Sequence, residues 1–331
     1  MTWASVIIPC RNEAGTLEAC LDALDRQSFP RGRFEVLVVD GQSTDGCGEI
    51  ARKRGVRLLE DPGDGPSAAR NVGIREARGA IVAFTDADCV PSPGWLAALH
   101  EVFAERPALG GVGGALRMPR RTLLGRLEDN DARAFYRGVI TSNVAYRRDA
   151  LLSVGGFDET LACAEDYDLA WRLRDAGFEV VHDPRPVVVH DPPEIDGSLS
   201  TYLRKQFWYA RHDVPTHARA LARARRGASG SREALPGVLL SAPPAGLLAA
   251  AAAGALGGEA WLVAAGLAGA AARATRRVLK GGAGREALPM IAVATAKELA
   301  RGAGTLRGLV DLARSSWAPA PPAAAPWPQA S

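Results

Sequence analysis

Two carboxylates separated by one residue, Asp86 and Asp88, come directly after the apolar run Ala80–Phe84. A carboxylate pair at this spacing can hold a hard divalent cation such as Mg²⁺ or Mn²⁺, because these ions prefer oxygen ligands. A diphosphate would supply further oxygens to the same ion. A solvated acidic turn after a strand has the same sequence, so the pair alone is a weak indication of a metal site.

Polar side chains also follow other apolar runs near the start of the chain. They are Arg11, Asn12 and Glu13 in the loop that begins at Pro9, Asp40 and Ser43 after the second run, and Arg70 and Asn71 in the helix-opening stretch 65–71. A carboxylate such as Asp40 can accept hydrogen bonds from a ribose or a base, and Arg70 would bring a guanidinium towards a diphosphate. Helix capping or surface ion pairing explains each cluster taken alone. Four clusters at successive strand ends indicate a ligand site.

Short β-branched runs alternate with helix-length segments over the first half of the chain. We predict strands at Ser5–Pro9, Phe34–Asp40, Val56–Leu59 and Ala80–Asp86, and helices at Gly15–Gln27, Thr44–Arg54, Ser67–Arg78 and Pro93–Glu105. This alternation predicts an α/β domain with a mostly parallel sheet covered by helices on both faces. Ligands of such sheets bind at the carboxyl ends of the strands, where the polar clusters fall.

The pattern loosens after Pro119. A polar segment, 123–137, precedes a predicted strand at Val139–Tyr146 and a helix that starts at Arg148. We predict a further helix at Asp166–Ala176 and a strand at Val187–His190. Residues 202–232 are basic and have helical spacing.

Composition and charge limit the possible classes of protein. The 331 residues are 47% apolar and 23% charged, which excludes wholesale disorder. Five irregularly spaced cysteines, without a CxxC pair, exclude a zinc ribbon and fit a reducing cytosol. The first residues lack the basic region and cleavage site of a signal peptide.

The net charge of +3 conceals two oppositely charged parts. Residues 1–200 carry 23 basic and 31 acidic side chains, whereas residues 201–331 carry 17 and 6. The acidic first part argues against nucleic acid as a partner, because phosphate contacts need clustered Lys and Arg. A basic, apolar rear indicates an enzyme held against an anionic membrane surface.

The rear part contains two uncharged runs, Ala234–Gly258 and Ala260–Ala272. The first run, 25 residues long, reaches the length of a membrane span, although it is rich in Ala and Gly and contains prolines. We predict a hydrophobic helical hairpin at 234–272 that inserts into the membrane, with basic flanks on the cytoplasmic side. A buried helical pair packed on the enzyme is the alternative. Residues 273–316 are predicted as a basic amphipathic region, and 317–331 as a disordered tail rich in Pro and Ala.

Six strings in the first 200 residues resemble family-2 glycosyltransferases, which have the GT-A fold. They are VIIPCRNEAG, VLVVDGQSTDG, GPSAARNVGI, FTDADCVP, TSNVAYRRDALLSVGGFDE and AEDYDLAWRLRDAG, and they occur in the order typical of that family. The resemblance is specific for the class of enzyme and says little about the sugar. It implies a catalytic domain at 1–220, followed by a basic linker at 221–233.

The resemblance also implies roles for single residues. Asp40 and the Pro9–Glu13 loop would bind the nucleoside, and Asp86 and Asp88 would hold Mg²⁺ or Mn²⁺ against the diphosphate of a UDP-, GDP- or dTDP-sugar. Asp166, next to Glu165, would be the general base of an inverting transfer, and His190 would lie near the metal. Acidic residues are also common at helix N-termini because of the helix dipole, and a histidine at a strand end is often structural.

The stretch around residue 206 indicates how the acceptor is used and which residues bind it. Processive relatives have a Gln-x-x-Arg-Trp motif after the base, and this region, QFWYARH, lacks that spacing. Transfer of one sugar per encounter is therefore expected. Gln206, Trp208, Tyr209 and Arg211 are candidates for an acceptor site near the membrane. An amphipathic helix covering the core would have the same pattern.

Three hypotheses follow for the function. The first is a metal-dependent, membrane-associated glycosyltransferase that uses a nucleotide sugar and a lipid-linked or cell-envelope glycan acceptor, on the cytoplasmic face of the cell membrane. The second is a sugar nucleotidyltransferase, which would need a Gly-rich phosphate loop that VIIPCRNEAG lacks. The third is an inactive GT-A-like membrane scaffold, which the acidic residues at the metal and base positions disfavour.

Overall fold

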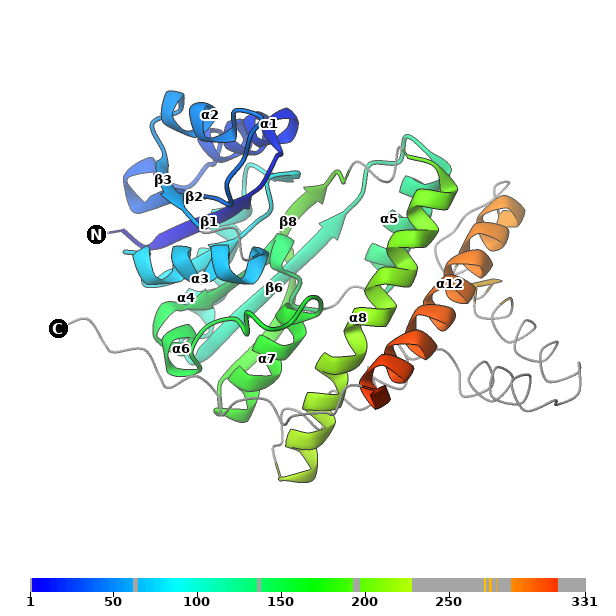
Figure 1. Cartoon of the computed structure of the whole chain (residues 1–331). Helices are drawn as coiled ribbons and strands as arrows, with labels where there is room; N and C mark the ends of the chain where they lie inside the picture. Colours follow the sequence, from blue (N-terminus) through cyan, green and yellow to red (C-terminus); the bar gives the residue numbers. More distant parts are fainter. Residues whose placement is uncertain are drawn as a thin grey trace, which may run out of the picture.

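The computed structural model describes residues 2–61, 65–135, 138–192, 197–227, 271, 274–275, 278 and 287–314. An eight-stranded sheet forms its centre (Figure 1), with the strand order β3-β2-β1-β4-β7-β6-β8-β5. The strands are β1 (Ala4–Cys10), β2 (Phe34–Asp40), β3 (Arg57–Glu60), β4 (Ile81–Phe84), β5 (Cys89–Pro91), β6 (Leu109–Arg117), β7 (Val144–Arg147) and β8 (Glu179–His190).

The sheet is parallel in its first half and mixed in its second. Strands β3, β2, β1 and β4 run parallel, as predicted, so their carboxyl ends share one edge. Strand β7 is antiparallel to both β4 and β6, whereas β6 and β8 are parallel and β5 is antiparallel to β8. The prediction of an α/β sheet is confirmed, and the expected dominance of parallel pairing holds only for the N-terminal strands.

Strand β6 has no counterpart in the sequence prediction, because four of its nine residues are glycine. The packing explains this composition. A Cβ atom added at Gly111 would lie 2.3 Å from Cδ1 of Tyr146, and one at Gly113 would lie 2.3 Å from the carbonyl oxygen of Gly138. Glycine lets β6 approach its neighbours closely. Because glycine has no apolar side chain, the sequence of β6 lacks the pattern by which a strand is predicted.

Helices cover both faces of the sheet. The helices α1 (Ala14–Asp25), α2 (Cys47–Lys53) and α4 (Trp95–Glu105) pack on one face, and α3 (Pro66–Glu76), α6 (Arg148–Ser153) and α7 (Glu165–Asp175) pack on the other. Successive strand residues supply the two cores in alternation: Val6 and Ile8 join the first, and Ile7 joins the second.

Three further helices pack beside the sheet. Helices α8 (Leu199–Arg225) and α12 (Ala287–Arg314) lie side by side, and α5 (Leu123–Phe135) contacts α12 (Figure 1). The polar stretch 123–137, for which no element was predicted, thus contains a helix. Its carboxylates Glu128 and Asp131 are buried and accept hydrogen bonds from Nζ of Lys297 at 2.5 and 3.0 Å. The hydroxyl of Tyr202 on α8 also donates to Glu128.

This buried ion-pair network attaches the C-terminal helix to the catalytic domain. Helix α8 continues without a break across residue 220, the predicted domain boundary. The predicted hydrophobic hairpin at 234–272 lies outside the described residues, apart from Ala271, as does the predicted tail at 317–331. Among the described helices, none combines the length and the apolar character that a membrane span requires.

Replacing Lys297 with methionine should lower the free energy of unfolding by about 3 kcal/mol, because Glu128 and Asp131 would remain buried without their cation. Urea denaturation of the full chain measures this loss. Arg307→Met is the matched control, since it removes an exposed pair with Asp311 on the same helix and should cost less than about 1 kcal/mol. Equal effects of the two variants would contradict a structural role for the buried network.

Candidate active site

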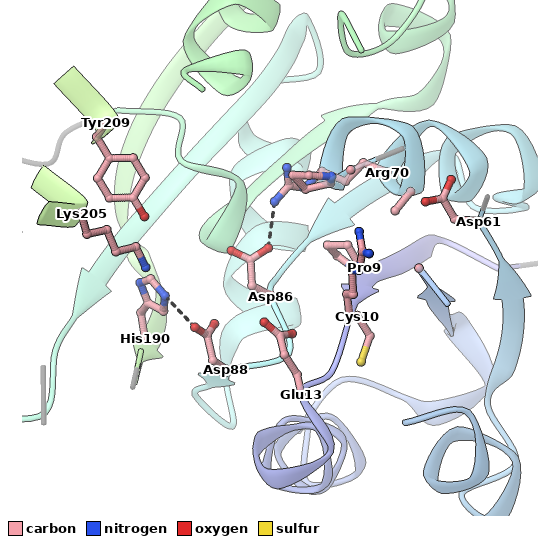
Figure 2. A pocket seen from close by; sticks show the side chains of 15 residues that line it. Pro9, Cys10, Glu13, Asp61, Arg70, Asp86, Asp88, His190, Lys205 and Tyr209 are labelled. Atoms are coloured by element: carbon pink, nitrogen blue, oxygen red, sulfur yellow. Dashed lines mark hydrogen bonds and ion pairs between the residues drawn. The ribbon is translucent and has the colours of Figure 1, made fainter. Parts of the chain in front are cut away.

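A cavity of about 410 Å³ opens at the carboxyl ends of β1, β2 and β4 (Figure 2). The residues that line it are Pro9, Cys10, Arg11, Glu13, Gly41, Asp61, Gly65, Pro66, Ala69, Arg70, Asp86, Asp88, His190, Lys205 and Tyr209. The N-terminus of α3 contributes to the wall through Gly65, Pro66 and Ala69. Backbone N–H groups at such an end favour a phosphate group.

Three carboxylates, those of Glu13, Asp86 and Asp88, gather on one side of this cavity (Figure 2). Burial, together with the negative charges of Asp88 and Asp86, raises the pKa of Glu13 to about 7. Burial opposes charge on Asp88 as well, but the hydrogen bond and positive charge of His190 outweigh it and lower the pKa of Asp88. Nε2 of His190 lies 3.2 Å from Oδ2 of Asp88.

The chemistry of this cluster suits a hard divalent cation. Asp88 and His190 approach each other closely enough to share one ion, and Asp86 lines the same cavity. The third group near them, Cys89, is fully buried, and burial raises its pKa well above the ordinary value, so it stays a thiol. Mutual repulsion among the carboxylates, visible in the raised pKa of Glu13, would be relieved by a cation.

Arg70 connects the two acidic motifs. Its side chain is 5% exposed, and it donates from Nη2 to Asp86 at 3.0 Å and from Nη1 to Glu165 at 2.8 Å. A guanidinium at this depth needs charged partners on both sides to offset its desolvation. Arg70, which the sequence predicts to bind a diphosphate, thus also bridges Asp86 after β4 and Glu165, the first residue of α7.

A second cavity, of about 340 Å³, adjoins the first and shares Asp86, His190 and Tyr209 with it. Its remaining described lining residues are Leu116, Met118, Glu128, Ile140, Thr141, Ser142, Cys163, Ala164, Glu165, Asp166, Tyr167, Pro192, Tyr202, Gln206, Asp213 and Arg301. The two predicted motifs, Asp86/Asp88 and Glu165/Asp166, therefore face neighbouring cavities that meet at one wall.

Asp166 lies in the first turn of α7, and the left-handed backbone of Ala164 (φ 58°) starts this helix. The backbone N–H of Tyr167 donates to Oδ1 of Asp166 at 2.8 Å. Burial, reinforced by the negative charge of Glu165, nevertheless raises the pKa of Asp166 to about 8. A carboxylate with its pKa near neutrality is suited to accept a proton from a hydroxyl.

Four of the predicted nucleotide-sugar residues hold loops and helices together. Asn12, Asp40 and Ser43 join the loops after β1 and β2: Ser43 Oγ accepts from the N–H of Asn12 at 3.0 Å, and Asp40 Oδ1 accepts from the N–H of Ser43 at 3.0 Å. Asn71 is buried, and its amide bonds the backbone of Phe157 and the carboxylate of Glu159. These four side chains are absent from the described lining of the cavity.

The four acceptor candidates on α8 divide into two pairs. Gln206 and Tyr209 line the second cavity. Trp208 is exposed and stacks on His212, with ring centroids 4.3 Å apart. Arg211 donates from Nε to Asp311 on α12 at 2.7 Å, outside the described lining of both cavities.

Several cavity residues were not predicted from the sequence. Lys205 precedes the predicted Gln206 and could have been included with it. Asp61 follows β3 at the same sheet edge as Asp40, so the position of strand ends would have indicated it. Asp213 and Arg301 carried no such signal, because α8 and α12 meet only in the folded chain.

Comparisons with known proteins agree with this geometry. The model of glycosyl transferase family 2 matches residues 5–151. A Haloferax volcanii protein described as glycosyltransferase AglE is 33% identical over 223 residues, which are 62% of this chain and 71% of that protein. A Mycobacterium tuberculosis pre-mycofactocin glycosyltransferase is 29% identical over 65% of this chain, which spans about half (47%) of its length.

Among solved structures, a mannosyltransferase from Pyrobaculum calidifontis in complex with GDP-mannose and Mn²⁺ superposes with a TM-score of 0.65. It is 26% identical, and the match covers 93% of this chain and 87% of that one. The Staphylococcus aureus TarS fragment 1–349 with UDP shares the fold, with a TM-score of 0.54 at 18% identity over 96% of this chain and 93% of that one.

The fold and the paired acidic motifs define a sugar-transferring enzyme with a GT-A fold. The chain belongs to glycosyl transferase family 2. The resemblance inferred from its motifs is thereby confirmed, and membership favours a glycosyltransferase over a sugar nucleotidyltransferase.

Replacing Arg70 with methionine should destabilise the fold by about 2–3 kcal/mol at pH 7, because Asp86 and Glu165 would lose their shared cation. The loss should be smaller in a background that carries both Asp86→Asn and Glu165→Gln, where neither acidic partner of Arg70 remains. Urea denaturation at pH 7 of the protein with and without Arg70, in both backgrounds, measures the difference. Arg106→Met, which removes an exposed pair with Glu179, serves as the control. A loss of the same size in both backgrounds would argue against the bridge.

Proposed function

We propose that the chain is a metal-dependent, inverting glycosyltransferase that moves a sugar from a nucleoside-diphosphate donor to an acceptor hydroxyl. One observation carries the proposal: the cavity lined by Asp86 and Asp88 adjoins the cavity lined by Asp166, and the two share Asp86, His190 and Tyr209. A donor in the first cavity and an acceptor in the second would meet at this shared wall.

Asp86, Asp88 and His190 would hold the divalent cation, Mg²⁺ or Mn²⁺. When bound, such an ion supplies Lewis-acid stabilisation of the negative charge that develops on the departing diphosphate. The N-terminus of α3 and the guanidinium of Arg11 line the same cavity and would orient the phosphates. Asp40 and the Pro9–Glu13 loop remain the predicted nucleoside-binding residues.

Asp166 would act as the general base. In one displacement the acceptor oxygen attacks the anomeric carbon from the face opposite the leaving group, the bond to the diphosphate breaks, and the hydroxyl proton passes to Asp166. This sequence inverts the anomeric configuration. Glu165 helps by keeping the pKa of Asp166 high, while its own carboxylate pairs with Arg70.

The first donor to test is GDP-mannose, because it is bound by the mannosyltransferase from Pyrobaculum calidifontis that shares fold and sequence with this chain. UDP- and dTDP-sugars complete the panel. For the acceptor we propose a lipid-linked or cell-envelope glycan and transfer of one sugar per encounter. The basic C-terminal part, with 17 basic and 6 acidic side chains, supports a place on the cytoplasmic face of a membrane.

Donor turnover should depend on metal and on the Asp86/Asp88 pair. With Mn²⁺, one sugar nucleotide of the panel should release its nucleoside diphosphate, and EDTA should abolish the release. Asp88→Asn and Asp86→Asn should each lower turnover at least about a hundredfold, by weakening the hold on the cation. Asp183→Asn is the control, because this half-buried carboxylate of β8 pairs with Arg185 and is absent from the described lining of both cavities. Full activity of both site variants would refute the proposal.

Turnover should also follow the ionisation of Asp166. The base must be deprotonated to accept a proton, so kcat/KM should rise with pH below about 8 and level off above it. Asp166→Asn should lower kcat by about 10²–10⁴-fold and remove this rise. Steady-state rates measured from pH 5.5 to 9.5 test both points. A variant that retains the same pH profile would exclude Asp166 as the base.

A further inference from the structure

The charge of the second cavity restricts the acceptor that it can take. Five of its described lining residues are carboxylates: Asp86, Glu128, Glu165, Asp166 and Asp213. Basic groups in the described lining are Arg301 and His190. Acidic groups therefore predominate on the side of the shared wall where the acceptor would bind.

Both basic side chains in the described lining of this cavity have acidic partners: Arg301 donates to Asp213 at 3.3 Å, and His190 contacts Asp88. Nearby, Arg70 bridges Asp86 and Glu165, and Lys297 pairs with Glu128 and Asp131. A phosphate that paired with one of these basic groups would have to displace a carboxylate and lie beside the others. Juxtaposed like charges disfavour such binding.

Hydrogen bonding leads to the same conclusion. The carboxylates of Glu128, Glu165 and Asp213, each paired with a basic side chain, accept hydrogen bonds, and so does a fully ionised phosphate, whereas a sugar hydroxyl can donate. The lining also contains apolar and aromatic side chains, among them Met118, Ile140, Tyr202 and Tyr209, beside the polar side chains of Thr141, Ser142 and Gln206. Acceptor-rich polar groups beside aromatic surface match a molecule that has many hydroxyl groups and an apolar ring face.

We infer that the acceptor presents a neutral sugar, or another uncharged polyol, to this cavity, and that any phosphate of a lipid carrier lies outside it. This inference rests on the proposed transferase function and specifies its acceptor. Arg211, a predicted acceptor residue, instead pairs with Asp311 outside the described lining of this cavity.

The side chains that would hold the neutral acceptor come from α8 and α12. Asp213 and Gln206 lie two helical turns apart on α8, and Arg301 of α12 reaches both, with Nη1 at 3.4 Å from Oε1 of Gln206 and Nη2 at 3.3 Å from Oδ2 of Asp213. These are long contacts for charge-assisted hydrogen bonds. We assign the three residues to binding hydroxyl groups of the acceptor, remote from the proton transfer at Asp166.

The first test compares acceptors at saturating donor, using the sugar nucleotide that the donor panel identifies. The probes are octyl α- and β-glycosides of glucose, mannose, galactose and N-acetylglucosamine, and farnesyl monophosphate. Mass spectrometry detects a glycosylated product. We expect transfer to at least one octyl glycoside and none to farnesyl phosphate. Transfer to the phosphate, or donor turnover without transfer to any glycoside, would overturn the inference while leaving metal-dependent donor turnover intact.

The second test uses two variants that each remove one ion pair between α8 and α12. Asp213→Asn breaks the pair with Arg301 at the cavity, and Asp311→Asn breaks the pair with Arg211 outside its described lining. We expect Asp213→Asn to lower kcat/KM for the octyl glycoside roughly tenfold to a hundredfold, through KM, with unchanged donor affinity and thermal stability near that of Asp311→Asn. Equal acceptor kinetics of the two variants would overturn the role of Asp213.

Discussion

The buried guanidinium of Arg70 links the two acidic motifs of the site, because it pairs with Asp86 of one and Glu165 of the other. It belongs to α3, and it binds the aspartate at the end of β4 and the glutamate that begins α7. A charge at this depth is tolerated only between fixed partners, so its position determines the separation of the two acidic motifs. Because one motif faces each cavity, the same contact sets how a donor and an acceptor would approach each other.

The site brings several carboxylates together in partly buried positions, where desolvation and mutual repulsion disfavour their ionised forms. Burial and neighbouring carboxylates raise the pKa of Glu13 to about 7 and that of Asp166 to about 8, so both groups resist ionisation in the free protein. Under the proposed function, this repulsion would dispose the cluster of the first cavity to take up a cation. In the second cavity it would give Asp166 the basicity that proton transfer needs. One electrostatic feature, clustered and partly buried carboxylates, would thus serve different chemistry in the two cavities.

The sequence signals for the first cavity are local, and five of the nine predicted nucleotide-sugar residues line it, whereas Asn12, Asp40, Ser43 and Asn71 are absent from its described lining. Each strand there is a short β-branched run, and parallel pairing brings the polar residue after it to a common edge. The acceptor half depends on contacts between distant segments, such as Lys297 with Glu128, 169 residues apart. Strand β6 and helix α5 could not be predicted from apolar periodicity, because β6 is rich in glycine and α5 buries charged residues that pair with Lys297. The same limit applies to Asn71, whose polarity indicated a ligand but whose amide secures the backbone of Phe157.

The residues of the two cavities lie differently relative to the part of the chain that the family model matches. The family model matches residues 5–151, which include the Asp86/Asp88 pair and Arg70, whereas Asp166, Gln206, Asp213 and Arg301 all lie beyond it. Helices α8 and α12 contribute the last three of these residues, and the buried Lys297 network attaches α12 to the domain. A change in α12 can alter the wall of the second cavity without moving the strands at the edge of the first, since α12 packs in a separate core, whereas α8 also lines the first cavity through Lys205 and Tyr209. Under the proposed function, substitutions in α12 would therefore change the choice of acceptor while the donor cavity keeps its lining, although the two cavities meet at Asp86, His190 and Tyr209.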